Sequence, residues 1–335
     1  MKTLKNRALN AGPTYGSQQN IQAADIAFDI HTQVDSAFYD TLYPDYEWYN
    51  ILKDDQVMSD VNAGATSYAY ITRNRHGAAA FIGSGQQNDI PMVGQSAGAV
   101  QVPIAYSAVG AIVTNEDARQ YKFGFNGNLA EDLGAAMRAA CDNLVESTVI
   151  FGNKDLDFKP WIDYPGLTVF QAASNGASGK ASTKWADKTG QQIVRDVNAA
   201  LTAMWKNSRT LFKPTTIFLP LDQYALITEL PIVIGNTGTA TTVIEFLATH
   251  NIMYRVTGKE LEFIPSRYLA GAGQGGTDRM VIMERSKANQ CMPFPLAYTL
   301  TQPMPDNLAV KWFSEQKFGS YHVRQQGSMA YVDGI

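Results

Sequence analysis

A match to the pattern G-x-S-x-G at residues 94–98 is the first group of residues that could carry chemistry. In hydrolases this pattern places a nucleophilic serine, here Ser96, on a sharp turn between a strand and a helix. Residues 100–104 follow with apolar and polar side chains alternating and include a proline, so they predict a strand. A catalytic triad would also need a distant base such as His322, with Asp278 or Asp306 as its acid. A serine hydrolase using Ser96 is therefore an alternative that the local pattern disfavours.

A second match, G-x-G-x-x-G at residues 271–276, is the pattern of a dinucleotide-binding loop. Such a loop must follow a strand and open a helix whose N-terminus holds the pyrophosphate. Residues 277–284 are instead patterned like a strand. We therefore expect a surface loop at 271–276 and no cofactor.

Metal-binding and redox patterns are not found in the sequence. Cys141 and Cys291 are far apart and form neither a disulfide framework nor a metal spacing, and we expect Cys141 to be buried in a helix. The histidines also lack the spacing of a metal pair. They are His31, His76, His250 and His322. We expect no metal site and no catalytic residues.

The composition excludes a basic nucleic-acid-binding domain. The net charge is −4 and the pI about 5.6, so any contact with DNA does not neutralise phosphates over a large patch. The low charged content, 17%, fits a subunit that buries surface against neighbours, and also a monomer with a large core. The sequence has neither the apolar core of a signal peptide nor an apolar run near the ~20 residues of a membrane span. We expect a soluble protein made in a reducing cytoplasm.

The elements around residues 94–98 predict a long two-stranded arm over residues 67–113. Residues 67–76 are patterned as an outgoing strand and 100–113 as a returning one. Between them, residues 77–99 hold five Gly and five Ala. Sixteen extended residues would reach roughly 50 Å, which is further than a hairpin needs to stay on its own core. We therefore expect the arm to lie on something else.

Five side chains of the outgoing strand are candidates for contacts between subunits: Tyr68, Tyr70, Arg73, Arg75 and His76. The cations among them could meet carboxylates of a neighbour. They could equally form a solvated edge that prevents stray strand pairing. The residues alone leave both interpretations open.

Helical spacing of apolar residues predicts the longest helix over 129–151, with Asn128 able to cap it and Gly152 able to end it. Thr242 and Glu245 form a capping box for a helix near 243–250. Further helices are predicted at 189–207 and 222–230, and a loop is predicted from 152 to 187. Strands are predicted at 215–219, 254–256, 261–264, 280–284, 308–312 and 321–332. The irregular alternation of helices and strands predicts the α+β class.

This order of elements resembles the major capsid proteins of tailed double-stranded DNA phages, which have the Hong Kong 97-type fold. Residues 214–224 resemble the strand-proline-helix step of that family's A-domain. Residues 324–335 resemble the ending of one subfamily, although Gln326 stands where that subfamily often has Gly. The resemblance divides the chain as follows: N-arm 1–45, E-loop and flanking P-domain segment 46–125, P-domain spine helix 126–151, mainly A-domain 152–300, and returning P-domain strands 301–335.

The resemblance implies a structural protein without enzymatic activity. Copies would self-assemble as pentamers and hexamers of an icosahedral head that encloses double-stranded DNA without sequence-specific binding. The location implied is the virion, with assembly in the host cytoplasm. The partners implied are the chain itself, a scaffolding protein, a portal and a cement or decoration protein. Contact with a membrane is not implied. The short N-terminal segment predicts a separate scaffolding protein.

An encapsulin-like nanocompartment shell with the same fold is a second alternative. Some members of the phage family crosslink subunits through a lysine of the E-loop. This chain has no lysine between Lys53 and Lys122, so such a crosslink is chemically excluded for residues 61–121. The arm is therefore expected to hold its neighbour through contact area.

Overall fold

The computed structural model describes residues 45–81, 91–125, 129–234 and 237–335. The chain divides into two units, Met1–Asp45 and Tyr46–Ile335, and only the second is described below. Three sequence predictions lie outside the described residues: the N-arm apart from its last residue, the Asn128 cap, and the outermost part of the arm.

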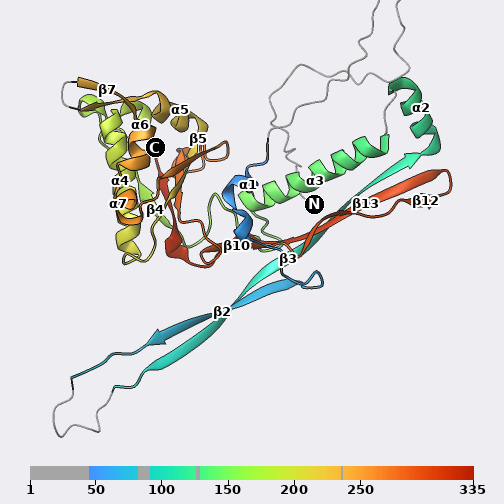
Figure 1. The fold of residues 1–335 in the computed structure, drawn as a ribbon, viewed down its shortest axis with the longest axis horizontal. Helices are drawn as coiled ribbons and strands as arrows, with labels where there is room; N and C mark the ends of the chain where they lie inside the picture. The colour runs from blue at the N-terminus through green and yellow to red at the C-terminus, as the bar shows by residue number, and fades with distance from the viewer. Residues whose placement is uncertain (1–44, 82–90, 126–128, 235–236) are drawn as a thin grey trace, which may run out of the picture. The chain divides into compact units, whose positions relative to one another are not determined.

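An antiparallel sheet has the strand order β11-β13-β3-β2. Strand β3 (Gly94–Thr114) is its longest member. The first half of β3 pairs with β2 (Ser67–His76), and the second half pairs with β13 (Ala309–Gly319). Figure 1 shows β2 and β3 continuing together as a two-stranded ribbon beyond β13. The predicted arm is thus confirmed, with its returning strand beginning at Gly94 rather than at residue 100. The sheet is completed by β11 (Leu296–Leu300) and β12 (Met304–Asp306).

Helix α3 (Leu129–Phe151) packs on one face of this sheet, as Figure 1 shows. Its small side chains allow a close approach: Gln316 of β13 donates a hydrogen bond to the Cys141 carbonyl at 3.0 Å, and Cys141 is buried as predicted. Gly152 ends the helix with φ +69°, a conformation that glycine adopts without a Cβ penalty. The predicted end of this helix is confirmed, and its described part begins at Leu129.

A mixed sheet has the strand order β4-β15-β9-β5-β8. Its side chains alternate between two cores, because successive residues of a strand face opposite sides. Ile217 and Leu219 of β5 face one core, and Phe218 faces the other. The strands are β4 (Thr168–Gln171), β15 (Met329–Asp333), β9 (Arg279–Met283), β5 (Thr216–Pro220) and β8 (Glu262–Ser266).

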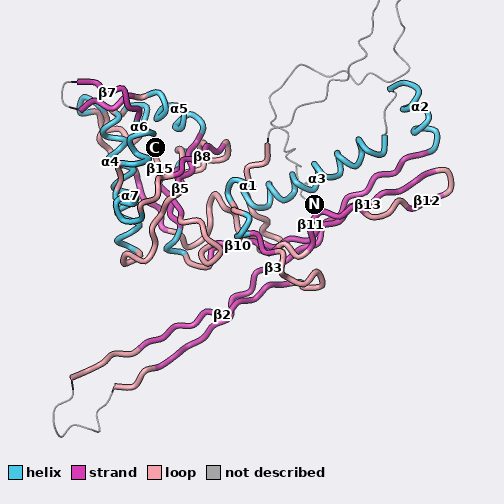
Figure 2. The backbone as a smooth tube through the Cα atoms, in the orientation of Figure 1, coloured by secondary structure: helices cyan, strands magenta, loops and turns pink. Residues whose placement is uncertain are grey.

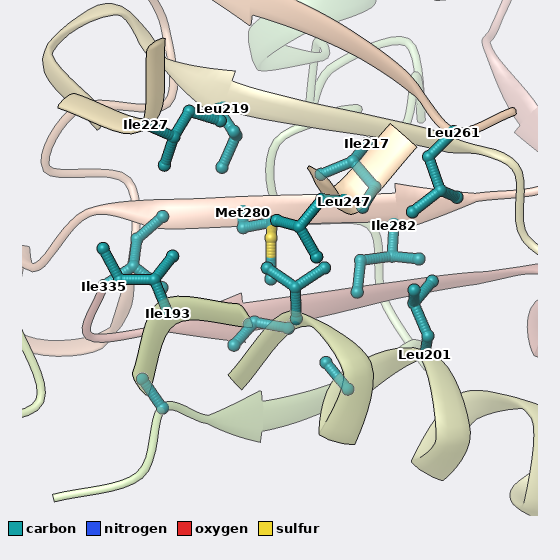
Figure 3. Packing of buried hydrophobic residues seen from close by; sticks show 14 of the residues in the cluster. Ile193, Leu201, Ile217, Leu219, Ile227, Leu247, Leu261, Met280, Ile282 and Ile335 are labelled. Carbon is teal, nitrogen blue, oxygen red and sulfur yellow. The ribbon is translucent and has the colours of Figure 1, made fainter. Parts of the chain in front are cut away.

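Four helices pack against the first of these cores. They are α4 (Gly190–Asn207), α5 (Leu221–Glu229), α6 (Val243–Thr249) and α7 (Ile252–Thr257). Figure 3 shows Ile193 and Leu201 of α4 in the same core as Met280 and Ile282 of β9. The predicted capping box of α6 is confirmed, with the Thr242 backbone N–H donating to the Glu245 carboxylate at 3.2 Å.

The second core joins the mixed sheet to the antiparallel sheet and α3. Val145 and Val149 of α3 lie in it with Phe318 of β13 and Tyr331 of β15. The described part of the chain has further elements, most of them short, and the helices among them are drawn in cyan in Figure 2. These further elements are α1 (Trp48–Ile51), β1 (Val57–Met58), α2 (Asn115–Phe125), β6 (Pro231–Ile234), β7 (Thr237–Thr242), β10 (Gln290–Pro293) and β14 (His322–Val323).

One predicted strand is wrong. Residues 254–256 lie in helix α7, because Asn251 caps it by accepting a hydrogen bond from the Tyr254 N–H at 2.7 Å. Gly258 ends this helix with φ +69°, and Met253 is buried on the core side. Helix α2 was not predicted, nor was the four-residue strand β4 within the expected loop. The strand predicted at 321–332 is divided into β14 (His322–Val323) and β15, because residues 324–328 lie outside both strands. The short elements α1, β1, β6, β7, β10, β11 and β12 were not predicted either.

Candidate assembly surfaces

The base of the arm is held by Arg324, which follows β14. Its Nη2 donates a hydrogen bond to the Tyr68 hydroxyl at 3.0 Å. The guanidinium also lies over the rings of Tyr68 and Tyr70, at 5.8 and 5.3 Å from their centroids. Its Nη1 donates to the Lys287 carbonyl at 2.9 Å. One arginine therefore connects the outgoing strand to the body of the subunit through charge-assisted and cation–π contacts.

His322 lies beside Arg324 and completes this anchor. Its Nε2 is 2.7 Å from the Tyr70 hydroxyl, and its Nδ1 is 3.1 Å from the Tyr164 hydroxyl. Burial, together with the nearby charges of Arg324 and Lys159, lowers the pKa of His322 to about 4. Burial raises the pKa of Tyr164 to about 12. All three groups are therefore uncharged at neutral pH.

The outer half of the arm makes few contacts with its own subunit. Arg73, Arg75 and His76 are exposed, and in the part of the chain that the structure describes no ion pair involves either arginine. Tyr68 and Tyr70, in contrast, are half-buried against Arg324 and His322. The five candidate residues thus divide into an anchored pair and a free group of three.

Apolar side chains are also exposed along the arm. Ile71 is 67% exposed on β2, and Met92 is 88% exposed just before β3. Phe81 and Val93 are exposed as well. Apolar groups in such a number on a thin ribbon are typical of a surface that another molecule covers.

A polar network connects α3 to the mixed sheet. The Glu146 carboxylate is buried and accepts hydrogen bonds from Arg267 Nη2 and the Tyr268 hydroxyl, each at 2.5 Å. Glu47 accepts from the Arg267 backbone N–H at 2.8 Å and from the Ser266 hydroxyl at 2.5 Å. Burial, and then the Glu146 carboxylate, raise the pKa of Tyr268. The network fixes the loop after β8 against the C-terminal part of α3.

The serine motif does not form a nucleophile elbow. Ser96 lies inside strand β3, paired with Asn74, where a hydrolase would need a turn into a helix. Both ring nitrogens of His322 contact tyrosine hydroxyls. The candidate acids are occupied elsewhere, since Asp278 accepts from Gln223 and Asp306 pairs with Lys311.

The glycine motif at 271–276 lies in a loop that leads into strand β9 and not into an α-helix. Its Gln274 N–H donates to the buried Asp333 carboxylate at 2.9 Å, which ties the loop to β15. Within residues 45–81, 91–125, 129–234 and 237–335, no group of His, Cys, Asp and Glu could hold a metal ion. None of the helices described is long and apolar enough to span a membrane.

Comparison with solved structures identifies the class of protein that this fold defines. The structure is similar to the capsid of Myoviridae phage XM1, with a TM-score of 0.71 and 14% identity over 95% of this chain and 100% of that one. It is also similar to a chain of Microbacterium phage Oxtober96, at TM-score 0.57 and 12% identity over 94% and 99%. The capsid of a native GTA particle matches at TM-score 0.54 and 9% identity over 95% and 99%. The fold is the Hong Kong 97-type fold of phage capsid proteins.

A family model described as major capsid protein matches residues 77–335, and the chain belongs to this family. No curated protein matches the sequence. The chain is thus a structural protein that forms the shell of a phage head.

The sequence predicted the arm, and the role of its five candidate residues in contacts between subunits stays a prediction. The sequence did not predict the partners of the arm base. Arg324 stands out in the sequence only through the C-terminal resemblance, and Tyr164 does not stand out at all. The residues that meet at the arm base are 252 and 256 positions apart, so no local pattern could connect them.

Proposed function

We propose that copies of this chain assemble as pentamers and hexamers of an icosahedral head that encloses double-stranded DNA. The observation that carries this proposal is the arm, a ribbon of β2 and β3 whose outer half is exposed on both faces. A two-stranded ribbon is marginally stable by itself in water. A neighbouring copy that covers the arm would supply the apolar contact that the ribbon lacks.

Contact area and charge hold the arm on its neighbour in this proposal. Ile71 and Met92 are buried by the neighbouring copy, while Arg73, Arg75 and His76 meet its carboxylates. Tyr68 and Tyr70 act at the anchored base, where they set the direction in which the arm leaves. No lysine lies between Lys53 and Lys122, so no lysine of the arm can form a crosslink to the neighbour.

We further propose the division into an N-arm, an E-loop with its flanking segment, a spine helix, an A-domain and returning strands, at the boundaries predicted from the sequence. The chain encloses DNA without reading its sequence and has no enzymatic activity. Assembly takes place in the host cytoplasm with a separate scaffolding protein, a portal, and a cement or decoration protein as partners. The net charge of −4 agrees with a container that does not bind DNA tightly.

Electron microscopy of the purified chain, after sedimentation at increasing protein concentration, tests the proposal. Rings of five and six copies and closed shells are the expected result. Small closed shells that package protein and no DNA in the expressing cell would favour an encapsulin-like compartment instead. A chain that stays monomeric at all concentrations, with and without a scaffolding protein, would refute the proposed assembly.

A further inference from the structure

The charges of the mixed-sheet part are segregated along the sequence. Residues 214–254 contain no Lys or Arg and three carboxylates, those of Asp222, Glu229 and Glu245. Residues 188–213 contain five cations and one carboxylate, Asp196. That carboxylate is buried and bonded to Lys188 at 2.5 Å, so the remaining cations of the segment have no acidic neighbour within it.

The fold places helix α4 of the first segment and helix α5 of the second at opposite edges of the mixed sheet. Helix α4 lies beside edge strand β4, because Ala199 and Ala203 of α4 line the same groove as Phe170 of β4. Helix α5 contacts β5 and the other edge strand, β8. Since the strand order is β4-β15-β9-β5-β8, α4 and α5 flank the two ends of the sheet.

The outer side of each helix carries charges of one sign. Arg195 and Lys206 are eleven residues apart, which is about three helical turns, so they lie on one face of α4. Asp222 and Glu229 are seven residues apart, about two turns, and lie on one face of α5. All four are exposed, and none takes part in an ion pair with another residue that the structure describes. We call Arg195 and Lys206 the cationic edge, and Asp222 and Glu229 the acidic edge.

Apolar features accompany both edges. A groove of about 160 Å³ between β4 and α4 is lined by Phe170, Ala199, Ala203 and Val332, and it adjoins the cationic edge through the two alanines. On the other side, Leu221 is 54% exposed and directly precedes Asp222. Each edge therefore combines an apolar feature with charge. The cationic edge is complementary in charge to the acidic edge, and neither edge is complementary to the same edge of another copy.

We propose that the cationic edge of one copy docks on the acidic edge of the next copy, with Leu221 entering the groove between β4 and α4. This inference rests on the proposed assembly and specifies one of its contacts. Two different surfaces of the same chain meet, so the contact is heterologous. A repeated heterologous contact closes a ring when the rotation between successive copies adds up to a full turn, as in the proposed pentamers and hexamers. Charge complementarity favours contact between the cationic edge of one copy and the acidic edge of the next, and it disfavours contact between two edges of like charge.

Two charge-reversal variants test the docking. The cationic-edge variant combines Arg195→Glu with Lys206→Glu, and the acidic-edge variant combines Asp222→Lys with Glu229→Lys. Each variant presents like charges on both edges, so we expect each alone to need at least about tenfold more protein to form rings. The control combines Lys122→Glu with Lys154→Glu, two exposed lysines away from both edges, and should assemble like the unsubstituted chain.

Mixing the two variants gives the decisive result. In an equal mixture every reversed edge has a complementary partner on the other variant, so rings should form again at the concentration that the unsubstituted chain needs. The copies must then alternate, and an alternating ring closes only with an even number of members. Native mass spectrometry should therefore find six-membered rings with three copies of each variant and no five-membered rings. The rescue also shows that both variants are folded.

Three outcomes would overturn the inference. The first is that both variants assemble like the control, and the second is that their mixture fails to recover although circular dichroism shows both to be folded. The third is that the cationic-edge variant assembles normally and loses only retained DNA, which would assign Arg195 and Lys206 to nucleic acid. Failure of the unsubstituted chain to assemble would instead contradict the proposed function, so the two failures are distinguishable.

Discussion

Removal of the Arg324 side chain should loosen the base of the arm. Arg324→Ala deletes the hydrogen bond to the Tyr68 hydroxyl and both ring contacts, with Tyr68 and Tyr70. A hydrogen bond from a charged donor contributes about 1 to 1.5 kcal/mol at a half-exposed site, and each cation–π contact about 0.5 kcal/mol. The sum is about 2 kcal/mol. Because 1.4 kcal/mol corresponds to a factor of ten, local opening of the base should become about 30-fold more frequent.

Hydrogen exchange on the unassembled chain measures this opening. The backbone amides of residues 67–71 should exchange about 30-fold faster in Arg324→Ala, while those of α3 should not change, because opening is local. Arg75→Ala is the matched control, since Arg75 is exposed and lies further out on the same strand. The reasoning is refuted if Arg324→Ala changes exchange at 67–71 by less than threefold, or if Arg75→Ala changes it as much.

Three further predictions concern the end of α3, the arm base and the serine motif. Gly152→Ala should destabilise the chain by at least about 3 kcal/mol in denaturant titration, because a Cβ at φ +69° would clash with the Phe158 carbonyl oxygen. Unchanged stability would contradict this. The pKa of His322 is lowered to about 4, so as the pH falls from about 6.5 the unfolded chain takes up the proton first. Stability should fall by about 1 to 2 kcal/mol between pH 6.5 and 4 after screening is allowed for, and His322→Gln should reduce that loss. Ser96 should not react with a fluorophosphonate probe, and Ser96→Ala should assemble normally; labelling at Ser96 would revive the hydrolase alternative.

Local signals predicted the elements that have clear starts and ends. The apolar spacing of α3 predicted the helix, and the glycine after it predicted its end. The Thr242–Glu245 capping box located α6. The alternation in β2 and β3 predicted the arm, because a period of two sustained over so many residues is typical of paired extended strands.

Prediction from the sequence failed for segments whose secondary structure depends on tertiary contacts. Residues 254–256, Tyr-Arg-Val, have side chains that favour strands, but the Asn251 cap and the burial of Met253 make this segment helical. Strand β4 is four residues long and pairs with β15, some 160 residues later, so no local pattern could reveal it. The anchor formed by His322 and Arg324 at the arm base was missed for the same reason.

The position of the arm in the assembled particle tests the central claim of this account most directly. Cryo-electron microscopy of assembled shells should show residues 71–81 and 91–99 of each copy lying on a neighbouring copy, with Ile71 and Met92 covered and Tyr68 still held by Arg324 of its own chain. An arm that folds back on its own subunit, or that remains uncovered in the closed shell, would contradict the account.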